Sequence, residues 1–225
     1  MTIAEPNSEI RGQLDQIRSA IMAAQGKSLH KQPVNLLAVS KTHDVTAIES
    51  AILAGQKIFA ENRVQEAAEK FPALRQKYPD LQLHLVGPLQ SNKVRDAVTL
   101  FDVIHTIDRA SLAEKLSREM ADQKRPLPCF IQVNTGEEPQ KAGVTPKALS
   151  TLLNECRSLK LNIIGLMCIP PVAESPAVHF AFLKKLADEN DLSQLSMGMS
   201  ADYETAIRFG ATHIRIGSAI FGTRD

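Results

Sequence analysis

The chain has 225 residues, of which 44% are hydrophobic, and 26 basic residues balance 25 acidic ones to a formal net charge of +1. This length allows one domain or two small ones, and an even charge without a basic block argues against an obligate nucleic-acid partner. The apolar runs are far too short to span a membrane, and the polar segment 1–9 lacks the apolar core of a signal peptide.

Cysteine and histidine usage narrows the chemistry further. The three cysteines are odd in number and lack CxxC spacing, which predicts neither disulfides nor zinc and favours a reducing compartment, the cytoplasm. The six histidines are scattered singly, which argues against a metal cluster. These residues are Cys129, Cys156 and Cys168, and His30, His43, His84, His105, His179 and His213.

The chain opens with apolar residues at helical spacing over 7–25, and we expect Gly26 to end that helix. A regular alternation of short apolar runs and amphipathic segments follows, without a hairpin-rich region. The predicted strands are 35–40, 57–60, 82–86, 102–107, 128–133, 161–168, 194–197 and 213–216. The predicted helices between them are 44–55, 62–76, 91–100, 108–123, 146–159, 176–189 and 201–209.

Eight βα units predict an α/β protein with a single (β/α)8 barrel over 1–225, preceded by the extra N-terminal helix 7–25. An open doubly wound sheet is the alternative. The count of eight favours the barrel, and so does the lack of a Gly-rich fingerprint after the first strand. In a barrel the active face lies at the carboxyl ends of the strands.

Lys41 follows the apolar run 36–40, at the predicted carboxyl end of the first strand. Desolvation there favours a neutral amine, and a neutral lysine attacks aldehydes to form a Schiff base. The competing interpretation is a lysine whose amine reaches the rim and has no special role.

The turns after the last two strands have the composition of an anion site. Met199 and Ser200 precede the helix 201–209, where Ser200 is the predicted N-cap and Gly210 the predicted stop. Gly217 and Ser218 follow the last strand, and the glycine allows close backbone approach. Turns after strands 7 and 8 are the recurrent phosphate site of this fold, although ordinary capping also explains each motif alone. A lysine facing a phosphate cup suits a ligand with an aldehyde and a phosphate, which describes pyridoxal 5′-phosphate (PLP).

Long segments of the chain resemble the pyridoxal phosphate homeostasis protein family in order and over almost the whole length. The matching segments are LLAVSKT (36–42), AENRVQE (60–66), HLVGPLQSNK (84–93), IHTID (104–108), QVNTGEEPQKAGV (132–144), GLMCIPP (165–171), LSMGMSADYETAI (195–207) and IRIGSAIFG (214–222). One departure is Ala60, where the family usually has glycine.

The resemblance implies a barrel similar to the N-terminal domain of alanine racemase, with PLP held as an aldimine on Lys41. It also implies that Met199, Ser200, Gly217 and Ser218 cradle the phosphate. Arg215 matches the arginine that faces the pyridine nitrogen, where a cation disfavours ring protonation. The competing interpretation of Arg215 is a salt bridge within the barrel.

Other polar residues near the predicted open face keep two interpretations each. Asn62 either bonds the phenolic oxygen of PLP or caps the next helix. Asn134 lines the pocket or makes a turn. Lys93, near Gln90 and Asn92, is a solvated cap or touches ligand, and Lys141 is a rim lysine or a second aldehyde-capture site. We expect His84 to be a satisfied barrel histidine, and Met167 and Cys168 to pack beside the cofactor.

The resemblance implies a cytoplasmic protein that stores or delivers PLP in vitamin B6 homeostasis, without catalytic turnover. Racemases of this fold add a second domain with a tyrosine base, and we expect neither here, since Tyr78 and Tyr203 are the only tyrosines. We also expect a monomer, with apo PLP-dependent enzymes as recipients of the cofactor. The alternatives are a racemase-like enzyme and a Schiff-base aldolase without PLP.

Overall fold

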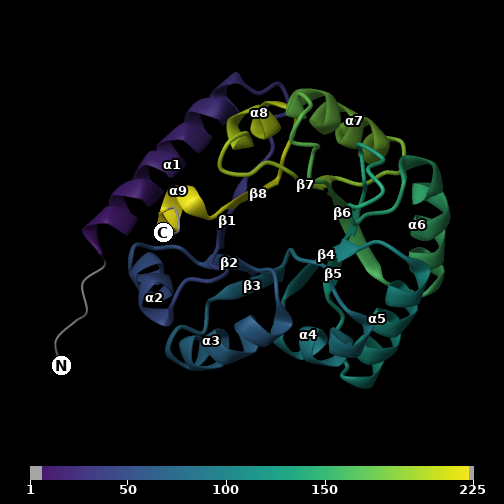
Figure 1. Cartoon of the computed structure of the whole chain (residues 1–225), viewed down its shortest axis with the longest axis horizontal. Coiled ribbons are helices and arrows are strands. Elements are labelled where there is room, and N and C mark those ends of the chain that lie inside the picture. Colours follow the sequence, from purple (N-terminus) through teal and green to yellow (C-terminus); the bar gives the residue numbers. More distant parts are fainter. Residues whose placement is uncertain (1–6, 223–225) are drawn as a thin grey trace.

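Eight parallel strands follow one another in sequence order around a closed barrel (Figure 1), in a computed structural model that describes residues 7–222. The strands are β1 (Asn35–Val39), β2 (Ile58–Glu61), β3 (Gln82–Leu85), β4 (Val103–Ile107), β5 (Pro128–Gln132), β6 (Asn162–Met167), β7 (Gln194–Ser196) and β8 (His213–Ile216). β8 pairs with β1, with Leu37 opposite Arg215. This pairing closes the sheet, so the alternative of an open doubly wound sheet is wrong, and the predicted barrel is confirmed.

Helices surround the barrel as an outer ring (Figure 1). They are α1 (Ser8–Lys27), α2 (Val45–Leu53), α3 (Val64–Lys77), α4 (Val94–Leu100), α5 (Ala110–Asp122), α6 (Leu149–Ser158), α7 (Pro176–Asp188), α8 (Tyr203–Arg208) and α9 (Ser218–Phe221), with 3₁₀ turns η1 (Ser91–Lys93) and η2 (Pro146–Ala148). Each predicted helix is present with shifted ends. The short α9 was not predicted, because four residues are too few for a helical period.

The N-terminal helix α1 confirms the predicted extra helix. Asn7 caps it by accepting from the Glu9 amide at 2.9 Å, and its buried face packs against α2, α8 and α9. The expected stop at Gly26 is wrong. Gly26 lies within the helix, which continues to Lys27. Ser28 has an extended backbone and forms the C-cap. A glycine ends a helix by turning left-handed, as Gly210 does after α8 with φ 96°.

Two layers of side chains make up the core. Large apolar residues between strands and helices form the outer layer, including Phe59, Phe71 and Phe180. The barrel interior instead contains two small apolar clusters, one of them Leu37, Val39, Ala60 and Val86, and the other Val103, Phe130 and Met167. Polar side chains, described below, separate the two clusters.

Three further observations concern the described part of the chain. All three cysteines are buried and unbonded. No helix within residues 7–222 combines the length and apolar character needed to cross a membrane. Within the same residues, no group of three or more His, Cys, Asp or Glu side chains is placed to hold a metal ion.

Candidate PLP site at the barrel mouth

A cavity of about 560 Å³ opens at the carboxyl ends of β1, β2 and β8 and the turn after β7. The seven residues that the sequence analysis assigns to cofactor binding all line it, namely Lys41, Asn62, Met199, Ser200, Arg215, Gly217 and Ser218. The apolar side chains of Val39, Val86 and Ile169 complete its walls. The topology therefore brings an amine, a guanidinium and two hydroxyls to one hollow, although they lie up to 177 residues apart in sequence, from position 41 to position 218.

Lys41 lies in a turn and not on the strand. β1 ends at Val39, the His43 amide donates to the Ser40 carbonyl at 3.1 Å, and Thr42 adopts a left-handed φ of 65°. The Lys41 side chain is half-buried. The first strand therefore ends one residue before the predicted position 40, and Lys41 lies in the turn directly after its carboxyl end, where it reaches the cavity.

A buried ionic cluster holds both neighbours of Lys41. Ser40 donates its hydroxyl to Glu61 Oε1 at 2.7 Å, and the Thr42 amide donates to Glu66. Lys70 of α3 donates to the Ser40 carbonyl at 3.0 Å, to Glu61 at 3.1 Å and to Glu66 at 2.6 Å. We call Ser40, Glu61, Glu66 and Lys70 the Glu61 cluster.

Sequence reasoning missed the Glu61 cluster. The one sequence pattern that points to it is the pair Glu66 and Lys70, which lie four residues apart and therefore on one helix face. Glu61 is fully buried, and burial raises the pKa of its carboxyl, while Ser40 and Lys70 oppose that rise. The cluster thus fixes the backbone on both sides of Lys41 with charge-assisted hydrogen bonds.

The two turns that follow β7 and β8 meet at one side of the cavity. Ser218 Oγ lies 3.3 Å from Ser200 Oγ. A Cβ added at Gly217 would lie 3.2 Å from the Val39 carbonyl oxygen, so a glycine permits the close approach of β8 to β1. Ser200 is not an N-cap, contrary to prediction. α8 starts at Tyr203, and Asp202 accepts from the Met199 amide at 2.6 Å, which leaves the Ser200 hydroxyl directed to its neighbours in the cavity wall.

Arg215 is buried beneath the cavity. Its guanidinium donates to Ser196 Oγ at 2.8 Å and to the Cys168 carbonyl at 2.9 Å. Among the described residues no carboxylate lies within ion-pair distance of it, so the alternative of a structural salt bridge is wrong. Burial lowers its pKa, and the negative charge of Asp202 opposes that change from farther away.

The remaining candidates divide between cavity and scaffold. Asn62 lines the cavity, and α3 is preceded by Arg63 instead, so the capping interpretation of Asn62 is wrong. The sequence analysis did not select His43, which also lines the cavity. Its ring stacks on Phe221, with 4.8 Å between the ring centroids. Asn134 makes a turn instead, donating to the Glu138 carbonyl at 2.8 Å.

Residues of β3 and β6 contribute to the barrel itself. His84 is buried in the barrel and its Nδ1 hydrogen-bonds His105 at 2.9 Å, but its Nε2 has no partner among the described residues, so the expected satisfied histidine is found at one ring nitrogen and not at the other. Met167 packs inside the barrel against Phe130, whereas Cys168 packs outward among the helices. Neither Met167 nor Cys168 lines the cavity, so their predicted packing directly beside the cofactor is not seen.

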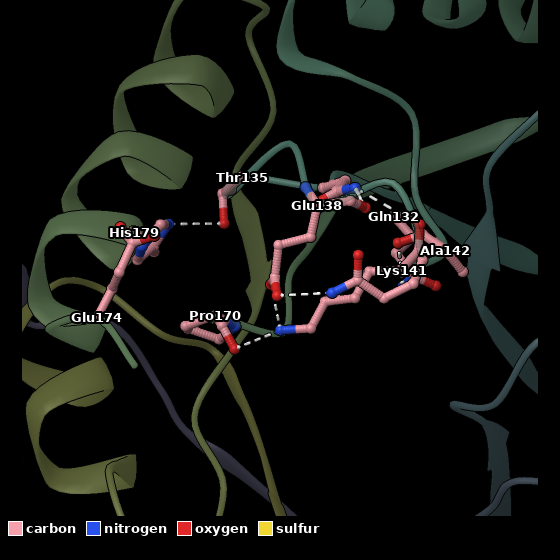
Figure 2. A network of polar contacts seen from close by, with 10 residues as sticks. Gln132, Thr135, Glu138, Lys141, Ala142, Pro170, Glu174 and His179 are labelled. Atoms are coloured by element: carbon pink, nitrogen blue, oxygen red, sulfur yellow. Dashed lines mark hydrogen bonds and ion pairs between the residues drawn. The ribbon is translucent and has the colours of Figure 1, made fainter. Parts of the chain in front are cut away.

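Lys141 is engaged away from the cavity, in the loop after β5 (Figure 2). Its amine pairs with Glu138 at 2.5 Å and donates to the Pro170 carbonyl at 3.2 Å. In the same view His179 bridges Thr135, at 3.0 Å, and Glu174, at 3.2 Å, which ties this loop to α7. Lys93 lines a separate hollow of about 540 Å³ with Asn62 and Arg63.

Comparisons with known proteins find relatives over almost the whole chain. Residues 13–225 match the family described as alanine racemase, N-terminal domain. The pyridoxal phosphate homeostasis protein of Vibrio cholerae is 43% identical, covering 96% of this chain and 97% of that protein. The protein of the same name from Escherichia coli K12 is 41% identical, covering 97% and 98%.

Solved structures extend the comparison to three dimensions. PipY of Synechococcus elongatus PCC7942, solved with PLP bound, has a TM-score of 0.84 and 39% identity, covering 95% of this chain and 100% of that one. Alanine racemase of Clostridium difficile 630 has a TM-score of 0.74 at 16% identity, covering 98% of this chain and 58% of that one, which shows the fold alone. The chain therefore belongs to the pyridoxal phosphate homeostasis protein family, within the wider family of alanine racemase N-terminal domains.

Proposed function

We propose that the cavity binds PLP and that Lys41 forms a Schiff base with it. The observation that carries this proposal is the convergence of Lys41, Arg215 and the Ser200–Ser218 pair on one cavity of about 560 Å³. Lys41 Nζ would hold PLP by condensing with its aldehyde carbon, with the carbonyl oxygen released as water. When bound, PLP supplies an aldehyde that exchanges between amines.

The phosphate belongs at the Ser200–Ser218 side. Two hydroxyls 3.3 Å apart offer donors to an anion, and the first turn of α9 adds backbone N–H groups without intrahelical acceptors. Met199 and Gly217 shape this side. Arg215 offers its guanidinium to the pyridine nitrogen, and Asn62 offers its amide to the phenolic oxygen.

The biological role we propose is PLP storage and delivery in vitamin B6 homeostasis, without catalytic turnover. Relatives at about 40% identity carry the name homeostasis protein, and PipY has been solved with and without PLP. Both tyrosines lie outside the cavity lining. Tyr78 donates to Glu49 at 2.8 Å, and Tyr203 opens α8, so neither is placed as an opposing base.

The proposal also covers the oligomeric state, the compartment and the partners of the protein. We infer a monomeric, single-domain, cytoplasmic protein whose partners are PLP and apo PLP-dependent enzymes. Size-exclusion chromatography with light scattering tests the monomer, and cell fractionation tests the compartment. Transfer across a dialysis membrane, compared with transfer in one chamber, separates free diffusion from direct delivery to an apo-enzyme.

Borohydride reduction of the PLP-loaded protein, followed by peptide mapping, tests the site. We expect a visible imine band before reduction and a fixed adduct on Lys41 afterwards. Lys41→Ala abolishes that adduct, whereas the control Lys141→Ala retains it, because Lys141 is paired with Glu138 outside the cavity. An unchanged yellow, reducible species in Lys41→Ala contradicts the proposal. An adduct on Lys93 or Lys141, found beside the one on Lys41, identifies a second capture site.

A further inference from the structure

Five polar side chains share the barrel interior with the two small apolar clusters, although this fold ordinarily packs bulky apolar residues there. They come from β3, β4, β7 and β8, and each is at most 6% exposed. These residues are His84, His105, Ser196, His213 and Arg215. Buried polar groups require hydrogen bonds, so the direction of each bond in this layer is constrained.

We infer that Ser196, His105 and His84 form a one-directional hydrogen-bond chain that starts at Arg215 and positions its guanidinium beneath the cavity without neutralising it. The three residues are positioning residues, because they act through Arg215. For the ligand this inference rests on the proposed PLP site, whereas the chain itself is a property of the protein.

The direction follows from the donors. A guanidinium has donors only, so Ser196 Oγ accepts from Arg215 at 2.8 Å. Among the described residues His105 Nδ1, 2.9 Å away, is the one acceptor within reach of the Ser196 hydroxyl, so we assign the hydroxyl proton to this contact. A neutral His105 that accepts at Nδ1 carries its proton on Nε2.

The second imidazole ends the chain. His105 Nε2 donates to His84 Nδ1 at 2.9 Å, so His84 also carries its proton on Nε2. Among the described residues His84 Nε2 is buried without a partner, so the chain ends at this atom, and its direction rests on the donors at Arg215 and Ser196. Burial lowers the pKa of His84 to about 3 and that of His105 well below its ordinary value, so each ring holds one proton at neutral pH.

Neutral partners leave the Arg215 charge available to the cavity. A carboxylate at the position of Ser196 would hold the guanidinium equally well but would cancel its charge. A hydroxyl and the Cys168 carbonyl fix the same group through dipoles. The chain therefore presents a positioned cation to an acceptor or anion in the cavity.

His213 provides an internal control in the same layer. The Asn35 amide donates to His213 Nε2 at 3.3 Å, which places the ring proton on Nδ1. Nδ1 then donates to Thr212 Oγ1 at 2.9 Å, and the Thr212 hydroxyl donates to the Leu195 carbonyl at 3.2 Å. His213 thus has the tautomer opposite to that of His84 and His105.

Long-range ¹H–¹⁵N correlation spectra of the ligand-free protein at pH 7 test the direction. We expect Nε2–H tautomers for His84 and His105 and the Nδ1–H tautomer for His213. An Nδ1–H tautomer or a charged ring at His84 or His105 overturns the inference. Because no PLP is present, this result is independent of the proposed function.

Ser196→Ala tests the positioning role, with Asn35→Ala as the matched control. Ser196→Ala removes an acceptor of Arg215 and should weaken PLP binding about tenfold or more, the scale of a hydrogen bond to a charged group, while His105 loses its fixed tautomer. Asn35→Ala removes the side-chain bond to His213 Nε2, leaves the His213 Nδ1–Thr212 bond in place and should keep PLP affinity within about twofold. Thermal unfolding of both variants is measured alongside.

The two variants separate the outcomes. If both weaken PLP binding in proportion to their loss of stability, the chain is merely structural and the inference fails. If wild-type protein binds no PLP while the tautomers are as expected, the proposed function fails and the hydrogen-bond chain stands.

Discussion

Removing the Lys70 amine tests how the Glu61 cluster supports the turn that carries Lys41. Lys70→Met preserves most of the side-chain volume but deletes three hydrogen bonds, to Ser40, Glu61 and Glu66. Breaking a buried ion pair from one side costs about 3–5 kcal/mol. The Lys70 side chain is 12% exposed and Glu66 is 20% exposed, so we expect the lower end, about 3 kcal/mol at pH 7.5.

The cost should depend on pH through Glu61. The pKa of Glu61 is already raised by burial, and Lys70 is one of the groups that restrain that rise. Without Lys70 the folded-state pKa rises further above the unfolded value. Folding then takes up a proton, and stability falls as pH rises through the folded pKa. The loss in Lys70→Met should therefore be smaller at pH 5 than at pH 7.5.

Urea unfolding of a double-mutant cycle with Glu61→Gln measures the coupling. The neutral amide removes the buried charge that Lys70→Met leaves without its lysine, so the double variant should cost less than the sum of the two single variants by at least about 1 kcal/mol. Costs that add within about 0.5 kcal/mol, or a loss that is the same at both pH values, would refute this account of the cluster.

Three further predictions concern the cavity and the core. Pyridoxal, which lacks the phosphate, should bind far more weakly than PLP, and equal affinities of the two vitamers contradict the phosphate assignment. Ser200→Ala should reduce the free energy of PLP binding, measured by titration, by about 1–2 kcal/mol, the scale of a hydrogen bond to a charged group. Burial raises the pKa of Cys156 and Cys168 to about 12, so the native protein should resist thiol reagents at pH 8 until urea unfolds it, and rapid native labelling argues otherwise. Deuterium exchange at the α-carbon of L-alanine should not exceed that with free PLP, and faster exchange that is lost in Lys41→Ala supports an enzyme.

The barrel was predictable because its signal is periodic. Eight apolar runs with a helix in each gap define both the strand count and the face on which Lys41, Gly217 and Ser218 meet. Local chemistry at the ends of elements was less predictable. Serine is a favoured N-cap residue, yet Asp202 and not Ser200 occupies the N-cap position of α8, because the backbone turns before the helix starts.

Residues that interact only after the barrel closes were the least predictable. Glu61 ends β2 and Ser40 follows the neighbouring β1, 21 positions away, and the sequence pattern of each is that of an ordinary strand end. Histidines scattered singly in sequence, such as His84 and His105, become neighbours only through β3 and β4. Their grouping is a consequence of strand register, which no local pattern reports.

The pairing of β8 with β1 has a consequence for how the protein holds a ligand. β1 and β8 lie side by side where the two ends of the barrel join (Figure 1). The cavity lies on this seam, because Lys41 follows β1 and Gly217 follows β8. α1 packs across the same seam, against α2, α8 and α9. Any partial opening that detaches either end divides the cavity in two, and a ligand bound there resists that opening by mass action. Amide hydrogen exchange should accordingly slow most in β1, β8 and α1 when the ligand binds, which makes cofactor retention and barrel closure one cooperative event.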